Sequence, residues 1–124
     1  MGSLPEIGLP HLRTQDTKNK QASHDNLEEV KRVEFDQRIE FLYKHANALY
    51  NDLIEHGVAK ECARSILPLG TPTRMYMSGS IRSWLHYIEI RAGIETQLEH
   101  RLIAEDCKKI FVENFPSIAE ALEW

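Results

Sequence analysis

The sequence predicts a helix-dominated α+β fold with one short strand and about four helices. Apolar side chains recur every three or four residues over most of the chain, which is the spacing of one helix face. Only one short stretch alternates with a period of two, as a half-buried strand does. Prolines and glycines separate these stretches. The 124 residues are enough for at most one ordinary domain.

Residues 1–26 are expected to form an extended arm and loop. This segment has prolines at positions 5 and 10, few large apolar side chains and a polar run from Arg13 to Asn26. It has too little apolar surface to build a core of its own. Residues 27–124 are expected to form the helical part of a single domain.

Two helices are expected in the first half of this domain. A long one begins at Leu27 and continues until Gly57 supplies a stop. Its apolar stripe consists of Val30, Val33, Ile39, Leu42, Ala46, Leu49, Tyr50, Leu53 and Ile54. A short helix over residues 59–66 follows, and it ends there because Pro68 cannot continue a helix.

A short strand and a central helix are expected next. Over residues 73–78 the side chains alternate, with Thr73, Met75 and Met77 on one side. The period then changes to that of a helix, whose stripe consists of Ile81, Trp84, Leu85, Ile88 and Ala92. A cluster of serine and glycine, residues 78–80, precedes the helix, and its hydroxyls are suited to accept the first free amide hydrogens.

The last long helix is expected to begin at a capping box formed by Thr96 and Glu99. Its stripe consists of Leu98, Leu102, Ile103, Ile110 and Phe111. Pro116 ends it before a short final turn. The stripes of at least three helices exceed what one short strand can cover, so we expect a partner surface.

Composition argues against several classes of function. The formal charge of −4 is unlike that of a general nucleic-acid binder, although a local arginine cluster can still take a phosphate. No apolar run approaches the roughly 18 residues that span a membrane, and no signal peptide precedes the first polar segment. We expect a cytoplasmic protein, or one of the host cytoplasm if it is viral.

Metal-binding and nucleophile motifs are not found in the sequence. Histidines, cysteines and carboxylates lack the spacing of a zinc or di-iron site, so no metal is expected. A glycine-rich phosphate loop and a serine elbow are also missing. Cys62 and Cys107 are expected to be buried thiols.

The central helix carries basic residues on two flanks of its apolar stripe. At about 100° per residue, Arg82, His86 and Glu89 fall on one flank, and Ser80, Tyr87 and Arg91 fall on the other. Arg82 and Arg91 therefore point in nearly opposite directions. Either they bind different ligands, or two chains meet here and each contributes one flank.

Several residues on and around this helix occur together at a fairly specific spacing. They are Ala63-Arg64, Leu67-Pro68, Ser80-Ile81-Arg82-Ser83-Trp84-Leu85-His86-Tyr87-Ile88, Arg91 and Gln97-Leu98-Glu99. This pattern resembles the C-terminal half of the flavin-dependent thymidylate synthases over about residues 57–122. The loop with Gln15, Asn19, Lys20 and Gln21 is also similar to that of viral and bacterial members.

The resemblance implies FAD-dependent methylation of deoxyuridylate (dUMP) to thymidylate (dTMP), with methylenetetrahydrofolate as carbon donor and NADPH as reductant. It implies that Arg91 contacts the uracil ring and favours its ionisation, and that Arg64 binds the same substrate. The residues implied to contact the flavin are Ser80, Ile81, Arg82 and His86. Arg64 and Arg91 also fit a purely structural role, as cations at the carbonyl ends of their helices.

The family's N-terminal half carries an Arg-His-Arg motif, and this sequence has no such triplet. We therefore expect the C-terminal part of a divided, processed or truncated enzyme that works with a separate N-terminal half. The resemblance also implies a homotetramer with active sites between subunits. The alternative is a catalytically inactive helical interaction module, or a fragment that needs a complementary N-terminal chain.

Overall fold

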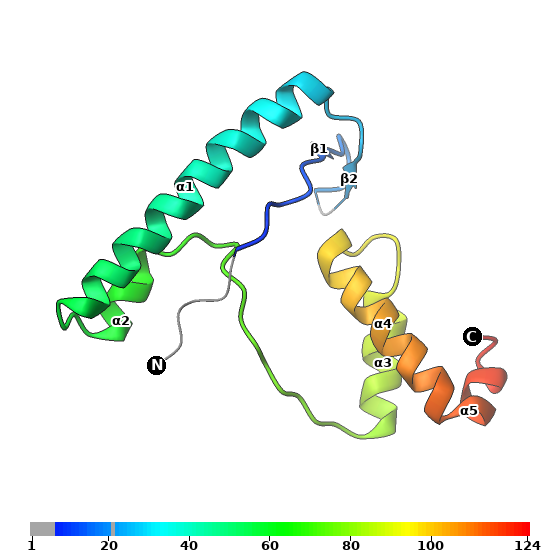
Figure 1. Cartoon of the computed structure of the whole chain (residues 1–124). Coiled ribbons are helices and arrows are strands. Elements are labelled where there is room, and N and C mark those ends of the chain that lie inside the picture. The colour runs from blue at the N-terminus through cyan, green and yellow to red at the C-terminus, as the bar shows by residue number, and fades with distance from the viewer. Residues whose placement is uncertain (1–6, 21) are drawn as a thin grey trace. The chain divides into compact units, whose positions relative to one another are not determined.

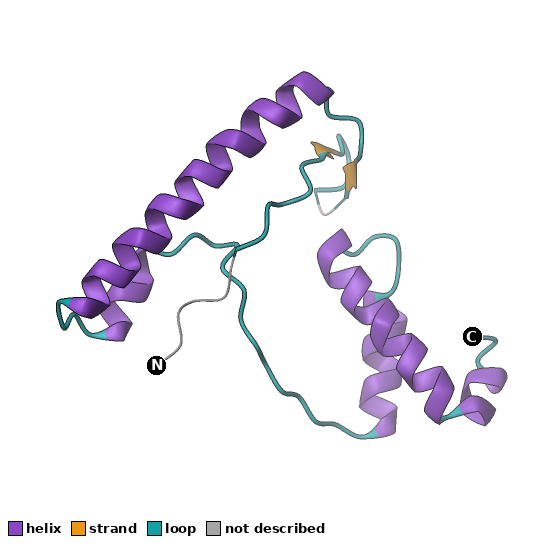
Figure 2. Ribbon diagram, in the orientation of Figure 1, coloured by secondary structure: helices purple, strands orange, loops and turns teal. Residues whose placement is uncertain are grey.

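The computed structural model describes residues 7–20 and 22–124, and the chain divides into two compact units (Figure 1). One unit contains the described residues before Arg13 together with residues 26–76. The other contains residues 13–25 and 77–124. Helices dominate, and the strands of the described residues are two short ones (Figure 2), which confirms the helix-dominated α+β class.

The first unit is built on a helical hairpin. Its helices are α1 (Glu29–Glu55) and α2 (Lys60–Ala63), and a 3-10 turn, η1 (Arg64–Ile66), follows directly. Gly57 has a φ of +79°, a left-handed conformation that glycine adopts without strain, so the predicted stop is confirmed. The buried residues of α1 and α2 are Ala46 and Ala63, and small side chains of this kind let two helices approach closely.

The strands lie in the segment that we expected to be an arm and loop. β1 (Thr14–Gln15) pairs antiparallel with β2 (Ser23–His24). Polar contacts hold the loop between them, because the side-chain amide of Gln15 lies 3.2–3.4 Å from the backbone carbonyls of Asp16, Asn19, Lys20 and Ala22. Residues 1–6 of the expected arm, and Gln21 of the loop, lie outside the described residues.

The predicted strand over residues 73–78 is wrong, because residues 71–80 have no regular secondary structure. Tyr76 is 87% exposed, and both neighbouring methionines are also exposed. A strand is stabilised by hydrogen bonds to a neighbouring strand, and none of the described residues pairs with this stretch. Alternation of side chains is therefore not sufficient to form a strand here.

The second unit combines the β-hairpin with three helices, α3 (Ile81–Arg91), α4 (Leu98–Asn114) and α5 (Pro116–Ala121). α3 packs on α4, and α4 packs on α5 (Figure 1). The core residues of this unit are Ile88, Ala104, Phe111 and Ala119. Ser80 caps α3 as predicted, since its hydroxyl accepts the backbone N–H of Ser83 at 3.2 Å.

The predicted capping box at the start of α4 is not formed. The hydroxyl of Thr96 donates to the carbonyl of Ile90, and the N-cap, Gln97, makes no side-chain cap hydrogen bond. Glu99 instead accepts a hydrogen bond of 2.7 Å from Arg13, which directly precedes β1. A charge-assisted hydrogen bond between ionised groups is about twice as strong as a neutral one. Glu99 therefore binds the guanidinium of Arg13 rather than the backbone N–H of Thr96.

Large parts of the predicted apolar stripes are exposed. On α4 the exposed members are Leu102, Ile103 and Ile110, and only Phe111 of the predicted stripe is buried. On α1, Ala46 is the one buried member. Each unit has too few elements to cover both sides of its helices. The structure thus leaves apolar surface of the kind that a partner covers.

Replacing Ile88, which is 1% exposed, by alanine is expected to lower the free energy of unfolding by about 3 kcal/mol. The truncation loses buried apolar surface and leaves a cavity between α3 and α4. Ile88→Val should cost about 1 kcal/mol. The matched control is Ile90→Ala on the same helix, at 50% exposure, with a cost below about 1 kcal/mol. Urea unfolding followed by circular dichroism measures all three, and equal losses at both positions would contradict the assigned core.

The loop of the β-hairpin is expected to weaken in acid. The backbone N–H groups of Asn19 and Lys18, and then His24, bind the carboxylate of Asp16 and lower its pKa from 3.8 to about 2. Because the folded pKa is the lower one, this stabilisation is present above pH ~4 and is lost as the pH falls towards 2. The amide signals of Lys18 and Asn19 in NMR spectra should report the change.

Asp16→Asn is the control for this titration. Its amide oxygen can still accept the two N–H groups but does not titrate. The acid-dependent shift of both amide signals should therefore disappear. An unchanged shift in the variant would assign the titration to another group.

Candidate functional site

α3 positions most of the residues that the sequence singled out. Ser80 stands at its N-terminus, where its hydroxyl caps the helix and also lies 3.0 Å from the hydroxyl of Ser83. A serine hydroxyl has one donor and two acceptor sites, so these two bonds leave little capacity for another ligand. The neighbouring Ile81 is 43% exposed and is available for an apolar contact.

Arg82 and His86 are exposed, one helical turn apart on the same side of α3. Within the described part of the chain, the guanidinium of Arg82 forms no ion pair or side-chain hydrogen bond. His86 likewise has no polar partner among these residues. This side of α3 therefore presents the guanidinium of Arg82 and the imidazole of His86, both without a polar partner among the described residues and in this sense uncommitted.

Arg91 is exposed in the last turn of α3. It is nine positions beyond Arg82, and nine residues make two and a half helical turns, so the two side chains leave opposite sides of α3. Arg91 also forms no ion pair among the residues that the structure describes. Its place at the helix C-terminus favours a cation there whether or not a ligand binds.

Arg64 belongs to the first unit, at the start of η1. It is exposed, and the described residues offer its guanidinium no carboxylate within ion-pair distance. Its backbone carbonyl accepts the N–H of Leu67 and so holds the turn that leads into Pro68. The expected site residues are thus divided between the two units, one on η1 and five on or next to α3.

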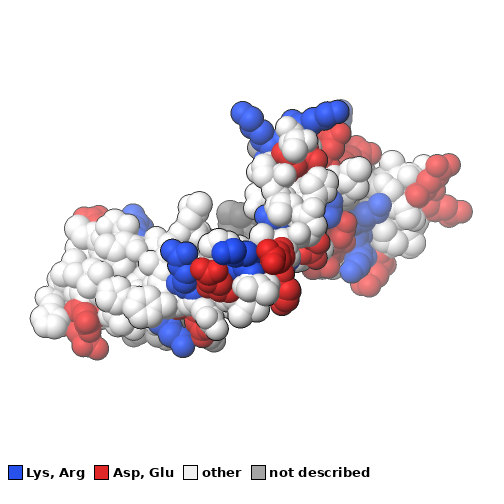
Figure 3. Space-filling model, turned by 90° about the horizontal axis from the view of Figure 1, so that it is seen from above, with Lys and Arg blue, Asp and Glu red and all other residues white. Residues whose placement is uncertain are grey.

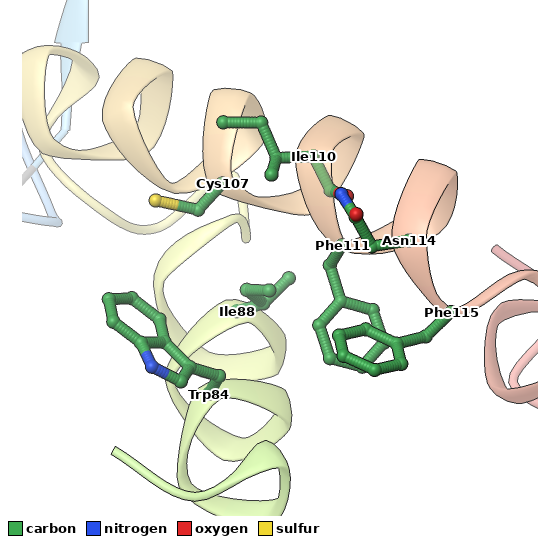
Figure 4. A pocket seen from close by; sticks show the side chains of 7 residues that line it. All are labelled: Trp84, Ile88, Cys107, Ile110, Phe111, Asn114 and Phe115. Carbon is green, nitrogen blue, oxygen red and sulfur yellow. The ribbon is translucent and has the colours of Figure 1, made fainter. Parts of the chain in front are cut away.

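A groove of 440 Å³ lies between α3 and α4 (Figure 4). It is lined by Trp84, Ile88, Cys107, Ile110, Phe111, Asn114 and Phe115. Its polar amide, on Asn114, already donates to the carbonyl of Ile110 at 2.8 Å. The groove contains none of the predicted site residues, and its apolar lining does not suit a phosphate.

A polar pair on α3 and α4 was not predicted. The phenol oxygen of Tyr87 lies 3.0 Å from Nε2 of His100. Burial raises the pKa of Tyr87, nearby Cys107 adds to this, and Arg91 acts in the opposite direction. The phenol is therefore protonated at neutral pH. No sequence signal links these residues, because the pairing depends on the register of two antiparallel helices.

An ion pair between Arg13 and Glu99 was also missed. Arg13 Nη2 lies 2.7 Å from Glu99, and its Nε donates to the hydroxyl of Ser23 at 2.7 Å. Burial tends to raise the pKa of Glu99, but the hydrogen bonds from Arg13, from the backbone of Glu99 and from Gln97 outweigh it and hold the pKa below its usual range. Arg13 thereby joins the β-hairpin to the start of α4.

The charged surface has no broad region of one sign on the face seen in Figure 3, where basic and acidic side chains are intermixed. On this face, a phosphate-bearing ligand would therefore depend on individual basic side chains rather than on an extended basic field. The described residues contain no cluster of three potential metal ligands. Cys62 and Cys107 are free thiols, but Cys62 is exposed, so the expectation of burial is wrong for it.

The described helices include none that is both long enough and apolar enough to cross a membrane. This finding concerns residues 7–20 and 22–124 alone.

Comparison with known proteins identifies clear relatives. The family model described as thymidylate synthase complementing protein matches residues 10–117. A probable flavin-dependent thymidylate synthase of Paramecium bursaria Chlorella virus 1 is 51% identical over 123 residues, which are 98% of this chain and 57% of the relative. The flavin-dependent thymidylate synthase of Synechocystis sp. is 49% identical over 112 residues, 90% of this chain and 52% of the relative.

A more distant relative, the flavin-dependent thymidylate synthase of Thermus thermophilus, is 32% identical over 112 residues, which are 90% of this chain and 40% of the relative. The chain thus spans about half of the length of the two more similar relatives. The family match begins ahead of the β-hairpin and includes α1, so it extends well beyond the segment whose sequence pattern carried the resemblance. On this evidence, the chain belongs to the thymidylate synthase complementing protein family of flavin-dependent thymidylate synthases.

Proposed function

We propose that this chain contributes part of the active site of a flavin-dependent thymidylate synthase. The reaction is the methylation of dUMP to dTMP, with methylenetetrahydrofolate as carbon donor and NADPH as reductant. Family membership supports the reaction class. The observation that carries the assignment of residues is the pair of uncommitted arginines, Arg82 and Arg91, on opposite sides of α3.

In this proposal Arg91 contacts the uracil ring of dUMP. A guanidinium keeps its charge at any relevant pH, so it can stabilise negative charge that develops on the ring without a change in its own protonation. Arg64 contributes a second cation to the same substrate, through charge-assisted bonds to phosphate or uracil oxygens. Both side chains are exposed and unpaired among the described residues, so each is available to bind an anionic ligand.

The opposite side of α3 is assigned to FAD, which supplies hydride transfer when it is bound. Arg82 fits an anionic cofactor because its exposed guanidinium has no carboxylate partner in the described part of the chain. His86 and Ile81 supply a polar and an apolar contact on the adjoining surface. Ser80 fits less well, since its hydroxyl already caps the helix.

The proposed assembly is a homotetramer of the cytoplasm, or of the host cytoplasm if the protein is viral, with active sites shared between subunits. A separate N-terminal half with the Arg-His-Arg motif is proposed to complete each site. Exposed apolar residues on α4, including Leu102, Ile103 and Ile110, support a need for partner surfaces.

The second candidate is a catalytically inactive helical interaction module, or a fragment that acts only with a complementary N-terminal chain. The exposed apolar helix surface favours it as well. Flavin binding separates the two candidates. A purified chain that absorbs as a flavoprotein, or that quenches the fluorescence of added FAD, supports the enzyme. A chain that responds to neither FAD nor dUMP supports the module.

The two arginines are expected to affect different ligands. Arg91→Gln should weaken dUMP binding by about 2 kcal/mol, or roughly thirtyfold, because a charge-assisted hydrogen bond is lost, and should leave FAD binding within twofold. Arg82→Gln should show the reverse. Isothermal titration with dUMP and quenching of flavin fluorescence measure the two affinities.

Arg74→Gln is the matched control, since Arg74 is also exposed and makes no described ion pair. It should change neither affinity. If each of the three variants lost affinity for both dUMP and FAD, the cause would be a general effect of charge. That result would count against separate binding surfaces on α3.

A further inference from the structure

One hydrogen bond connects side chains of α3 and α4. The phenol oxygen of Tyr87 lies 3.0 Å from Nε2 of His100, in a partly buried position. Among the described residues, no other side-chain hydrogen bond joins these two helices. The rings are also in contact, with centroids 5.7 Å apart, and the Tyr87 ring meets the ring of Trp84 edge-on at 5.6 Å. The phenol is therefore fixed by contacts on both helices.

The remaining contact between α3 and α4 is apolar and incompletely filled. Trp84 and Ile88 on α3 line the groove together with Cys107 and Phe111 on α4 (Figure 4). The hydrophobic effect is itself non-directional, and the groove leaves part of this contact unfilled. A hydrogen bond has a preferred distance and angle. The bond between Tyr87 and His100 thus adds a preferred distance and angle to the apolar packing of α3 on α4.

Arg91 is the site residue on the same side of α3 as Tyr87. It lies four residues beyond Tyr87, and residues four apart share one side of a helix. The turn that follows Arg91 is tied back by two further bonds, from Thr96 to the carbonyl of Ile90 at 3.3 Å and from Arg101 to the carbonyl of Ile94 at 3.2 Å. The end of α3 is therefore held on both sides of Arg91.

We propose that Tyr87 and His100 are positioning residues, which hold the Arg91 end of α3 against α4 and so direct the Arg91 guanidinium towards the uracil ring. The identification of the uracil ring as the ligand of Arg91 rests on the proposed function. The attachment of α3 to α4 is a property of this chain alone. In the tautomer of His100 that carries its hydrogen on Nδ1, Nε2 accepts a hydrogen bond from the phenol hydroxyl.

The test uses four variants of the full chain. Tyr87→Phe removes only the hydroxyl, and His100→Leu removes the acceptor. His100→Gln keeps a polar side-chain amide near the place of Nε2 and can still accept the phenol proton. The matched control is Tyr76→Phe, which removes the hydroxyl of a residue that is 87% exposed and has no described hydrogen bond.

The affinity for dUMP is measured by isothermal titration in the presence of FAD. Tyr87→Phe and His100→Leu should each weaken it about fivefold, as expected for one neutral hydrogen bond. His100→Gln should stay within twofold of the wild-type chain, and Tyr76→Phe should be unchanged. Wild-type affinity in Tyr87→Phe, or equal losses in His100→Gln and His100→Leu, would overturn the proposal.

Amide hydrogen exchange in the nucleotide-free chain separates this proposal from the proposed function. Residues 88–97 should exchange about fivefold faster in Tyr87→Phe and His100→Leu, whereas residues 81–85 keep their wild-type rates. If this pattern appears in a chain that binds no dUMP even when the proposed N-terminal half is supplied, the attachment of α3 stands and the proposed function fails. Unchanged exchange over residues 88–97 would overturn the positioning role even if dUMP binds.

Discussion

The packing of α3 on α4 is the contact on which the candidate site depends. α3 has 11 residues, and a helix of this length is only marginally stable by itself in water. Burial of Ile88 between the two helices supplies the stabilisation that the isolated helix lacks. Ala104 on α4 has no exposed surface, so the two backbones can approach closely. The directions of Arg82 and Arg91 follow from this contact, because both arginines are carried by α3.

One rigid helix can serve two ligands because its two flanks point apart. Arg82 and Arg91 are separated by two and a half turns, so one small molecule cannot bind both from the same copy of α3. The serine at the helix start is committed to capping, whereas Arg82, Arg91 and His86 have no polar side-chain partner among the described residues. Ligands on opposite sides of one helix are separated by its width of about 10 Å, so opposed cations of this kind suit an enzyme whose active sites are shared between subunits.

The exposed apolar surface bears on both candidate functions. Leu102, Ile103 and Ile110 on α4 are at least half exposed, and the adjoining groove is lined mainly by apolar side chains. A shared active site and a simple interaction module both need such surface to be covered. The exposed apolar surface therefore supports association with a partner, but it does not distinguish an enzyme from an interaction module. The assignment to an enzyme depends on the family membership and on the uncommitted arginines, which a module has no evident need to keep unpaired.

Local rules in the sequence determined the helices, the stop at Gly57, the cap at Ser80 and the opposed directions of Arg82 and Arg91. Each of these depends on residues within a few positions of one another, so the helical repeat and capping chemistry are sufficient. Tertiary structure decided where the strands form, since residues 73–78 alternate correctly but have no described partner strand. It also paired Arg13 with Glu99 and Tyr87 with His100. Arg13 and Glu99 are 86 positions apart, and no periodic pattern can specify a contact that arises only when distant segments pack together.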